Sequence, residues 1–372
     1  MQSFDRELFD RLVAAFRQGT LPETTGVVED GSRAVELGDI PSLPAAGSPL
    51  YAACIELGTD ILSRGQVAAI VLAGGAGTRF GGQVKALVPV LRDKTFLDFK
   101  LEDVRGAGER SRSQVAAALM TSDLTDRPIA DHIERHWRGS PIFLFQQQVL
   151  PRIYPDGQIA TEPNGKPSMT PTGHGDFFRA MRKTGLGERL YESGVRYLFF
   201  SNVDNLAATI DPAVIGYHAS HRSEMTLEVT ERRAPDGTLD EGGAPVLLQG
   251  RLVLKEKVRS AEHALLSTNN FIFELKPLLD REIELPWRVI RKKVLGKDVL
   301  QFETVSGEAS ALVDERRRPV LKTEFVRVAR ADPASSRFEP IKVPEHLTRA
   351  VQRMRPRLES LADSIERRSP AA

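Results

Sequence analysis

A glycine-rich stretch over residues 72–82 carries the clearest chemical signature in the sequence. It reads Leu72-Ala73-Gly74-Gly75-Ala76-Gly77-Thr78-Arg79-Phe80-Gly81-Gly82, and Lys85 follows shortly after it. Glycines let a backbone approach phosphate groups closely and turn several N–H groups toward one anion. A guanidinium or ammonium group beside such a loop can neutralise phosphate charge. The stretch therefore predicts a loop that binds a phosphate-bearing ligand.

Two common phosphate-binding motifs do not fit this loop. A dinucleotide-binding fingerprint needs G-x-G-x-x-G, but Phe80 stands three positions after Gly77, although Asp98 lies about where a ribose-binding carboxylate would. A P-loop needs Lys directly after its last glycine, and here Gln83 follows Gly82. The pattern G-G-x-G-T-R-x-G followed by Lys is instead similar to the signature of the sugar-nucleotide pyrophosphorylases.

The elements that must position this loop alternate between strands and helices. Four continuous apolar runs, each typical of a buried parallel strand, occur at residues 67–72, 115–120, 142–145 and 195–200. Helical patterns lie between them, at 126–137 and 177–190. Shorter alternating segments between 224 and 275 predict a mixed extension of the sheet with hairpins. We therefore expect an α/β fold with a doubly wound mixed sheet.

The two ends of the chain predict helices outside this sheet. Residues 1–65 open with an amphipathic helical pattern and continue through a proline-rich, irregular connection. Apolar residues near the C-terminus recur at helical spacing, and Pro356 should kink or split the helix that they predict. We expect an N-terminal extension at 1–65, a catalytic domain at 66–342, and a helical segment at 343–372 that packs onto the body.

The composition excludes several classes of protein. The 372 residues include 51 Lys and Arg against 50 Asp and Glu, and this balance argues against a nucleic-acid-binding protein. The single cysteine, Cys54, excludes an internal disulfide framework and a multi-cysteine zinc site. No apolar run reaches the ~18 residues of a membrane span. We expect a cytoplasmic enzyme that binds neither nucleic acid nor a membrane.

Eight further blocks follow the loop in an order that is typical of one enzyme family. They lie at residues 95–98, 145–152, 171–176, 202–206, 227–230, 267–270, 301–304 and 337–342. With the loop, they make residues 65–347 resemble the UTP–sugar-1-phosphate uridylyltransferases, the family of the UDP-glucose pyrophosphorylases. The resemblance implies a Rossmann-like nucleotidyltransferase fold of the glycosyltransferase-A kind.

The resemblance also implies the reaction and its ligands. A sugar-1-phosphate, most simply glucose-1-phosphate, attacks the α-phosphate of UTP and yields a UDP-sugar and pyrophosphate, with Mg²⁺ as cofactor. Such chemistry asks the protein for in-line positioning and charge neutralisation rather than for a nucleophile. The cations that would neutralise the phosphates and the leaving pyrophosphate are Arg79, Lys85 and Lys342. The nucleotide-binding residues would be Leu72, Ala73, Gly74, Gly75, Gly77, Thr78, Gln147 and Gly173, the last two at the uracil.

The remaining predicted site residues contact the metal and the sugar phosphate. Asp204 follows the strand predicted at 195–200, where open α/β sheets place ligand groups, and its carboxylate can share Mg²⁺ with phosphate oxygens. The resemblance places five residues at the sugar and its phosphate: His174, Asn202, Asn269, Asn270 and Glu303. His132 and His136 lie one helical turn apart without a metal-binding pattern around them and are interpreted as surface residues.

Alternatives remain open at this point. The loop with Arg79 is closer to the UDP-N-acetylhexosamine branch, whereas the His174, Asn269 and Glu303 blocks and Lys342 are closer to the glucose branch. UDP-N-acetylglucosamine synthesis is therefore the first rival, a UDP-sugar-binding homologue without turnover is the second, and an NAD-dependent oxidoreductase is a distant third. The chain offers no room for the family's C-terminal β-helix, which serves assembly, so we expect a monomer or a weak oligomer.

Overall fold

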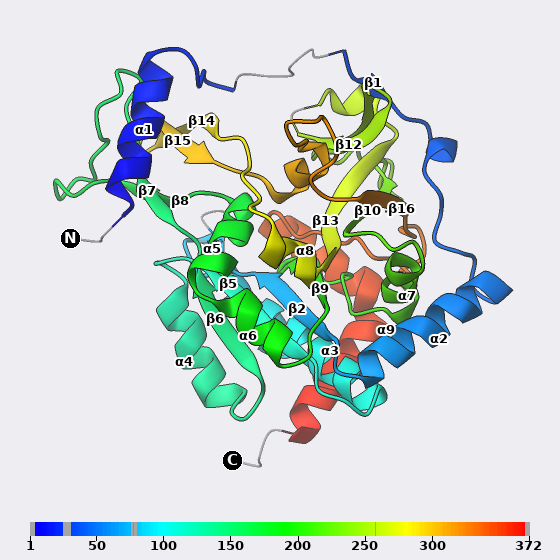
Figure 1. Ribbon diagram of the computed structural model, residues 1–372. Helices are drawn as coiled ribbons and strands as arrows, with labels where there is room; N and C mark the ends of the chain where they lie inside the picture. Colours follow the sequence, from blue (N-terminus) through cyan, green and yellow to red (C-terminus); the bar gives the residue numbers. More distant parts are fainter. Residues whose placement is uncertain (1–3, 25–30, 76, 78–79, 257, 369–372) are drawn as a thin grey trace.

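A seven-stranded sheet forms the centre of the computed structural model, which describes residues 4–24, 31–75, 77, 80–256 and 258–368 (Figure 1). The strand order is β16-β10-β13-β9-β2-β5-β6. Their bounds are Thr323–Arg327 (β16), Met225–Glu231 (β10), Leu265–Glu274 (β13), Tyr197–Asn202 (β9), Val67–Leu72 (β2), Ala116–Thr121 (β5) and Ile142–Gln146 (β6). Strands β9, β2, β5 and β6 are parallel neighbours, whereas β13 is antiparallel to both β9 and β10.

Helices cover both faces of the sheet, as the alternating pattern predicted. One face carries α2 (Pro49–Ser63), α3 (Phe96–Arg110), α4 (Asp126–His136), α7 (Pro212–Ser220) and α9 (Pro344–Arg368). The other carries α5 (Phe177–Lys183), α6 (Leu186–Glu192) and α8 (Leu275–Asp280). Successive residues of a strand point to opposite faces, so Ala69 and Val71 of β2 join the first core and Ala68 and Ile70 join the second. The doubly wound α/β prediction is confirmed.

Smaller sheets surround this centre. A three-stranded sheet combines β1 (Arg33–Ala34), β11 (Ala244–Leu248) and β12 (Arg251–Lys255). Three two-stranded sheets are formed by β3 (Pro89–Leu91) with β4 (Lys94–Thr95), β7 (Val149–Pro151) with β8 (Met169–Pro171), and β14 (Arg288–Val294) with β15 (Lys297–Glu303). Short 3-10 turns include η3 (Lys85–Leu87), η4 (His174–Asp176) and η6 (Ser306–Ala311). The hairpins expected between 224 and 275 are thus present.

The N-terminal segment packs onto the same body. Helix α1 (Arg6–Arg17) buries Leu8, Phe9 and Leu12 against the β14–β15 hairpin in a small core of their own. Helix α2 lies against α7, and Cys54 is buried there. Residues 31–65 therefore lie on the sheet core rather than apart from it.

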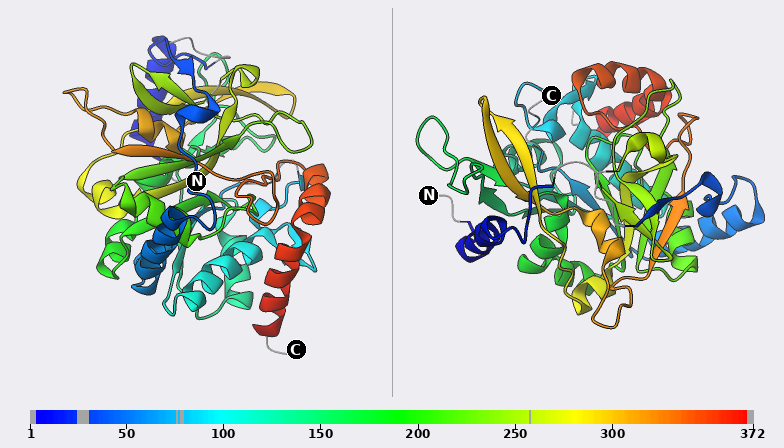
Figure 2. Two further views of the ribbon diagram at one scale, coloured as in Figure 1. Left: turned by 90° about the vertical axis from the view of Figure 1, so that its right-hand side faces the viewer. Right: turned by 90° about the horizontal axis from the view of Figure 1, so that it is seen from above.

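Two sequence expectations about helices were wrong. The pattern at 177–190 forms two helices, because Gly185 has φ +64° and the chain turns there between α5 and α6. Pro356 does not split the C-terminal helix, which runs unbroken along the outside of the body beside α3 (Figure 2). Pro356 has no N–H, so the carbonyl of Gln352 loses its hydrogen-bond donor within the helix. Both residues are exposed, so water can donate to that carbonyl instead. None of the described helices combines the length and apolar character that crossing a membrane requires.

Candidate active site

Several of the predicted site residues that the structure describes lie at the carboxyl edge of the sheet. Leu72 at the end of β2 stands opposite Asn202 of β9 and Met120 of β5, and Thr121 of β5 stands opposite Gln146 of β6. Four parallel strands therefore end at the same edge, and the loops that follow them meet there. This is where ligands bind in open α/β sheets.

The glycine-rich loop packs against Gln147, the residue predicted to bind the uracil. The Gln147 N–H donates to the Thr121 carbonyl at 2.9 Å, which fixes the start of its loop. A Cβ added to Gly74 would lie 1.9 Å from Nε2 of Gln147, so only glycine permits this approach. Gly77 has φ +56°, and its Cβ would lie 1.9 Å from the Gln83 carbonyl oxygen. Thr78 and Arg79 lie outside the described residues.

Lys85, which comes just after this loop in the chain, and Asp204 lie next to each other. Lys85 begins η3, and its backbone N–H donates to the Gly75 carbonyl at 3.2 Å. Its ammonium group forms an ion pair with the Asp204 carboxylate, and the two side chains are 19% and 16% exposed. A cation and an anion that were predicted from separate motifs are thus neighbours. A polyphosphate would attract Lys85, and a divalent cation would attract Asp204.

The Asp204 site fits a metal ion shared with phosphate groups. The described part of the chain holds no group of three or more His, Cys, Asp or Glu side chains that could bind a metal by themselves. Mg²⁺ usually keeps several waters and takes one or two carboxylates together with substrate phosphates. A single partly exposed carboxylate beside the glycine-rich loop, which is predicted to bind phosphate groups, is compatible with that requirement.

His174 lies at a second loop on the same edge. Gly173, with φ +86°, brings the backbone so close to the β15 end that a Cβ would lie 2.5 Å from the Thr304 carbonyl oxygen and 3.4 Å from the Glu303 Cβ. The Ser306 N–H donates to Nδ1 of His174 at 3.2 Å, and the Ser306 hydroxyl is 2.8 Å from the same nitrogen. Nδ1 is therefore the acceptor, and the neutral ring carries its proton on Nε2.

Burial lowers the pKa of His174 to about 4. The ring is therefore neutral at physiological pH, and it can offer Nε2–H as a hydrogen-bond donor without adding a positive charge. Its neighbour Glu303 accepts a hydrogen bond from the side-chain amide of Gln301. The structure thus brings Gly173, His174 and Glu303 close together.

The adjacent residues Asn269 and Asn270 have different positions. Asn269, with φ +57° within β13, donates from Nδ2 to the side-chain oxygen of Asn202 at the end of β9 at 3.0 Å, and both residues are partly exposed. Asn270 is fully buried and donates from Nδ2 to Glu228 at 3.1 Å. Asn270 was also expected at the sugar hydroxyls, but in this structure its side chain is turned to buried partners, whereas Asn269 is partly exposed.

Lys342 reaches the edge of the site from the C-terminal part of the chain. Ile341, its neighbour, donates its N–H to the Asp204 carbonyl at 3.2 Å. The Lys342 ammonium group donates to the Glu241 carbonyl at 2.8 Å and is partly exposed. The backbone thus attaches the Lys342 segment to the loop that carries Asp204, and the Lys342 side chain is held by the Glu241 carbonyl.

Comparison with known protein families shows to which family this chain belongs. A family model described as UTP–glucose-1-phosphate uridylyltransferase matches residues 55–352, which include every predicted site residue. The chain belongs to this family.

Individual relatives agree with the family. A UTP–glucose-1-phosphate uridylyltransferase of Encephalitozoon cuniculi is 31% identical over 66% of this chain and 52% of its own length. UTP–glucose-1-phosphate uridylyltransferase 2 of Dictyostelium discoideum is 31% identical over 74% of this chain and 56% of its own length. The chain thus spans about half the length of these curated relatives.

Solved structures of the family share the fold. A UDP-glucose phosphorylase of Trypanosoma brucei aligns with a TM-score of 0.75 at 23% identity, over 93% of this chain and 75% of that one. A uridine diphosphate N-acetylglucosamine pyrophosphorylase of the same organism, in complex with an inhibitor, aligns with a TM-score of 0.74 at 18% identity, over 93% and 75%. This chain therefore shares its fold with both of these proteins.

Two residues beside the site were not predicted. Ser306 fixes the His174 tautomer, and no motif marks it in the sequence. Asp176, buried at the end of η4, accepts the backbone N–H of Gln148 and so fixes the residue after Gln147. Burial raises the pKa of Asp176 to about 6. The signal in the sequence that could have identified Asp176 was its position in the block at residues 171–176.

Asp98 and His132 belong to one structural cluster, which corrects the interpretation of His132 as a surface residue. Asp98 caps α3 with Thr95 and accepts hydrogen bonds from His132 at 2.8 Å and from the Trp137 indole at 2.7 Å. Burial would raise the pKa of Asp98, but these hydrogen bonds hold it below its usual value. Asp98 is thus no ribose ligand, and His132 is partly buried rather than a free surface residue; His136 is exposed as expected.

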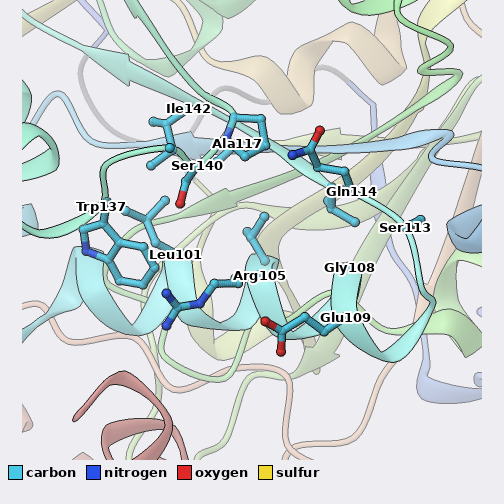
Figure 3. Close-up of a pocket in the computed structure, with 14 residues that line it drawn as sticks. Leu101, Arg105, Gly108, Glu109, Ser113, Gln114, Ala117, Trp137, Ser140 and Ile142 are labelled. Carbon is cyan, nitrogen blue, oxygen red and sulfur yellow. The ribbon is translucent and has the colours of Figure 1, made fainter. Parts of the chain in front are cut away.

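A separate cavity lies at the opposite edge of the sheet (Figure 3). It has a volume of about 240 Å³ and is lined by α3, the amino ends of β5 and β6, and the turn between α4 and β6. The Arg105 guanidinium carbon lies 4.6 Å from the centre of the Trp137 ring on one side of it. Among the predicted site residues that the structure describes, none lines this cavity, so it is distinct from the candidate active site.

Proposed function

We propose that this protein is a Mg²⁺-dependent uridylyltransferase that condenses UTP with a sugar-1-phosphate, foremost glucose-1-phosphate, to a UDP-sugar and pyrophosphate. The observation that carries the proposal is the Lys85–Asp204 pair at the mouth of the glycine-rich loop. It supplies a cation for the triphosphate and a carboxylate for a metal at the edge where the parallel strands end. Membership of the family supports the same reaction.

UTP would lie along the glycine-rich loop. The amide of Gln147 can donate and accept toward the imide edge of uracil, and its packing on Gly74 sets its distance from the loop. Loop N–H groups, Lys85 and Arg79 would hold the β- and γ-phosphates. The α-phosphate would then face the part of the site that binds the sugar-1-phosphate.

The sugar-1-phosphate would bind between the His174 loop and the residues Asn202, at the end of β9, and Asn269, within β13. The Nε2–H of His174 can donate to a phosphate oxygen, and Asn269 and Glu303 can bond sugar hydroxyls. The two polar side chains would otherwise lie against apolar strands, where hydroxyl partners stabilise them. The sugar-1-phosphate would then lie across the α-phosphate from the leaving pyrophosphate.

The transfer then exchanges one phosphoryl bond for another. An oxygen of the sugar-1-phosphate forms a bond to the α-phosphorus, and the bond from that phosphorus to the oxygen bridging the β-phosphate breaks. Pyrophosphate leaves with the electron pair, and Lys85, Arg79 and Lys342 neutralise its charge. The attacking oxygen is already ionised at neutral pH, so no general base is required. The residues contribute position and charge.

Asp204 would hold the Mg²⁺ ion. When bound, Mg²⁺ neutralises charge that develops on the phosphate oxygens. The role of Asp204 itself is to place one carboxylate oxygen at the phosphate edge, and Lys85 keeps that carboxylate paired when no ligand is bound.

UDP-N-acetylglucosamine synthesis is the second candidate. The sequence of the Arg79 loop favours it, and the fold is shared with a pyrophosphorylase of that branch. The curated relatives and the His174, Asn269 and Glu303 blocks favour glucose-1-phosphate. We further propose a cytoplasmic location, which suits a lone, buried, unpaired cysteine, and a monomer or weak oligomer.

The direct test is a pyrophosphate-release assay with UTP, Mg²⁺ and a panel of sugar-1-phosphates. We expect release with glucose-1-phosphate that stops when EDTA removes the metal. Preference for N-acetylglucosamine-1-phosphate would select the second candidate. Binding of UDP-glucose without release from any sugar-1-phosphate would identify a non-catalytic UDP-sugar-binding protein and refute the proposal.

A further inference from the structure

A buried ion pair lies behind the active site. Glu228 of β10 and Arg337, in the segment after β16, are 0% and 4% exposed. Arg337 donates from Nε to Oε2 of Glu228 at 2.8 Å and from Nη2 to Oε1 at 2.5 Å. Neither residue was assigned a role from the sequence. A buried pair of this kind adds little net stability over an apolar pair of the same size, so its presence calls for another explanation.

Two buried asparagines join this pair into a network. Asn270 donates from Nδ2 to Glu228 at 3.1 Å and to the Arg337 carbonyl at 3.2 Å. Asn205 donates from Nδ2 to the Asn270 side-chain oxygen at 3.3 Å and to the same Arg337 carbonyl at 3.1 Å. Their exposed fractions are 0% and 1%. The network thus connects β10, β13, the loop after β9 and the segment after β16.

Two ends of this network reach the predicted active site. Asn205 directly follows Asp204, and its side-chain oxygen accepts the N–H of Glu339 at 2.9 Å. Two residues later, Ile341 donates its N–H to the Asp204 carbonyl at 3.2 Å, and Lys342 comes next. The guanidinium of Arg337 also donates to the Thr209 carbonyl at 3.2 Å, in the same loop after β9. The loop that carries Asp204 and the Lys342 segment are therefore tied to each other through buried groups.

We propose that Glu228 and Arg337, with Asn205 and Asn270, are positioning residues that hold Asp204 and Lys342 in one fixed geometry for phosphoryl transfer. This inference rests on the proposed function. The four side chains are buried too deeply to touch a substrate, so they act through the backbone of the two active-site segments. The Asp204 carboxylate and the Lys342 ammonium group come from distant parts of the chain and would contact the same polyphosphate. A shared network of buried hydrogen bonds fixes their relative positions.

The test variant is Glu228→Gln, which keeps the shape of the side chain and removes its charge. We expect kcat to fall at least about tenfold and the Mg²⁺ concentration for half-maximal rate to rise, because Asp204 and Lys342 lose their fixed relation. The KM for UTP should change less than about threefold, since the Gln147 loop is not part of the network. A merely structural role would reduce the yield of folded protein and leave the kcat of the folded fraction unchanged.

The matched control is Glu102→Gln. Glu102 is a glutamate of α3 that is 2% exposed and pairs with Arg105, which lines the cavity at the opposite edge of the sheet (Figure 3). It is buried and ion-paired like Glu228 but lies outside the network. Its kcat and Mg²⁺ requirement should stay within about twofold of wild type once the fraction of folded protein is equal.

A second variant covers the case in which Glu228→Gln does not fold. Glu228→Leu combined with Arg337→Met replaces the pair by apolar groups, a change that proteins often tolerate in stability. A folded double variant with lowered kcat supports the proposal, and wild-type kcat in either folded variant overturns it. If wild-type protein releases no pyrophosphate with any sugar-1-phosphate, the proposed function fails instead, so the two failures are distinguishable.

Discussion

Gly74→Ala isolates the contact between the glycine-rich loop and Gln147. The added Cβ would lie 1.9 Å from Nε2 of Gln147 and 3.1 Å from its Cδ, so the amide must move away from the place that it now occupies. Alanine fits the backbone, because Gly74 has no left-handed φ. The displaced amide would lose its hydrogen bonds to uracil, which are worth about 1–3 kcal/mol. We therefore expect the KM for UTP to rise roughly 10- to 100-fold, with a smaller change in kcat.

Gly75→Ala is the control for this prediction. The nearest atom to a Cβ at Gly75 is the Lys85 Cβ at 3.9 Å, an ordinary contact, so the same methyl group one residue later displaces nothing. The assay is pyrophosphate release over a range of UTP concentrations, with thermal melts of both variants to compare their folding. Equal KM values for UTP in the two variants would refute the reasoning.

A double-mutant cycle sharpens the same test. If Gly74→Ala acts through Gln147, it should have little further effect on the KM for UTP in a Gln147→Ala protein, where no amide remains to be displaced. Additive effects of the two substitutions would show that the methyl group at 74 harms the site by another route.

Three other perturbations have defined outcomes. Lys85→Met should lower kcat by at least about 100-fold in the pyrophosphate assay. It should also tighten Mg²⁺ binding, measured by calorimetry without nucleotide, because Asp204 loses its competing partner. Weaker Mg²⁺ binding would contradict the pairing. Burial raises the pKa of Asp176 to about 6, so wild type should lose stability relative to Asp176→Asn as the pH rises from about 4 to about 6, by on the order of 3 kcal/mol in urea titrations. The opposite slope would show that Asp176 is stabilised in its ionised form. Pro356→Ala should raise the free energy of unfolding by about 1–3 kcal/mol, since the exposed proline interrupts the hydrogen bonding of α9; no gain would mean that the helix has already adapted to it.

The sequence allowed the central sheet and its functional edge to be predicted. Continuous apolar runs identify buried parallel strands without reference to other segments, and parallel strands in a doubly wound sheet end at one edge. The loop after β2 and the Asp204 loop after β9 therefore had to approach each other. Which atoms meet there could not be predicted, since Lys85 and Asp204 are 119 residues apart in the chain.

Strand register decided the contacts that were missed. Asn269 and Asn270 are chemically identical neighbours, and only the register shift of the β10–β13 pairing around them, with φ +57° at Asn269, sends one to Asn202 and the other to Glu228. Asp98 had the spacing of a ribose ligand, but its role depends on His132 and Trp137, which are brought to it by the packing of α4 on α3. Such details depend on tertiary packing, to which local sequence patterns are insensitive.

The central claim is attack on the α-phosphate of UTP, and isotope labelling tests it most directly. The protein would be incubated with Mg²⁺, glucose-1-phosphate and UTP that carries radioactive phosphorus at either the α or the γ position. The account predicts α-label in UDP-glucose and γ-label in pyrophosphate. Label released from the γ position as inorganic phosphate, or no α-label in any UDP-sugar across the sugar-1-phosphate panel, would contradict it.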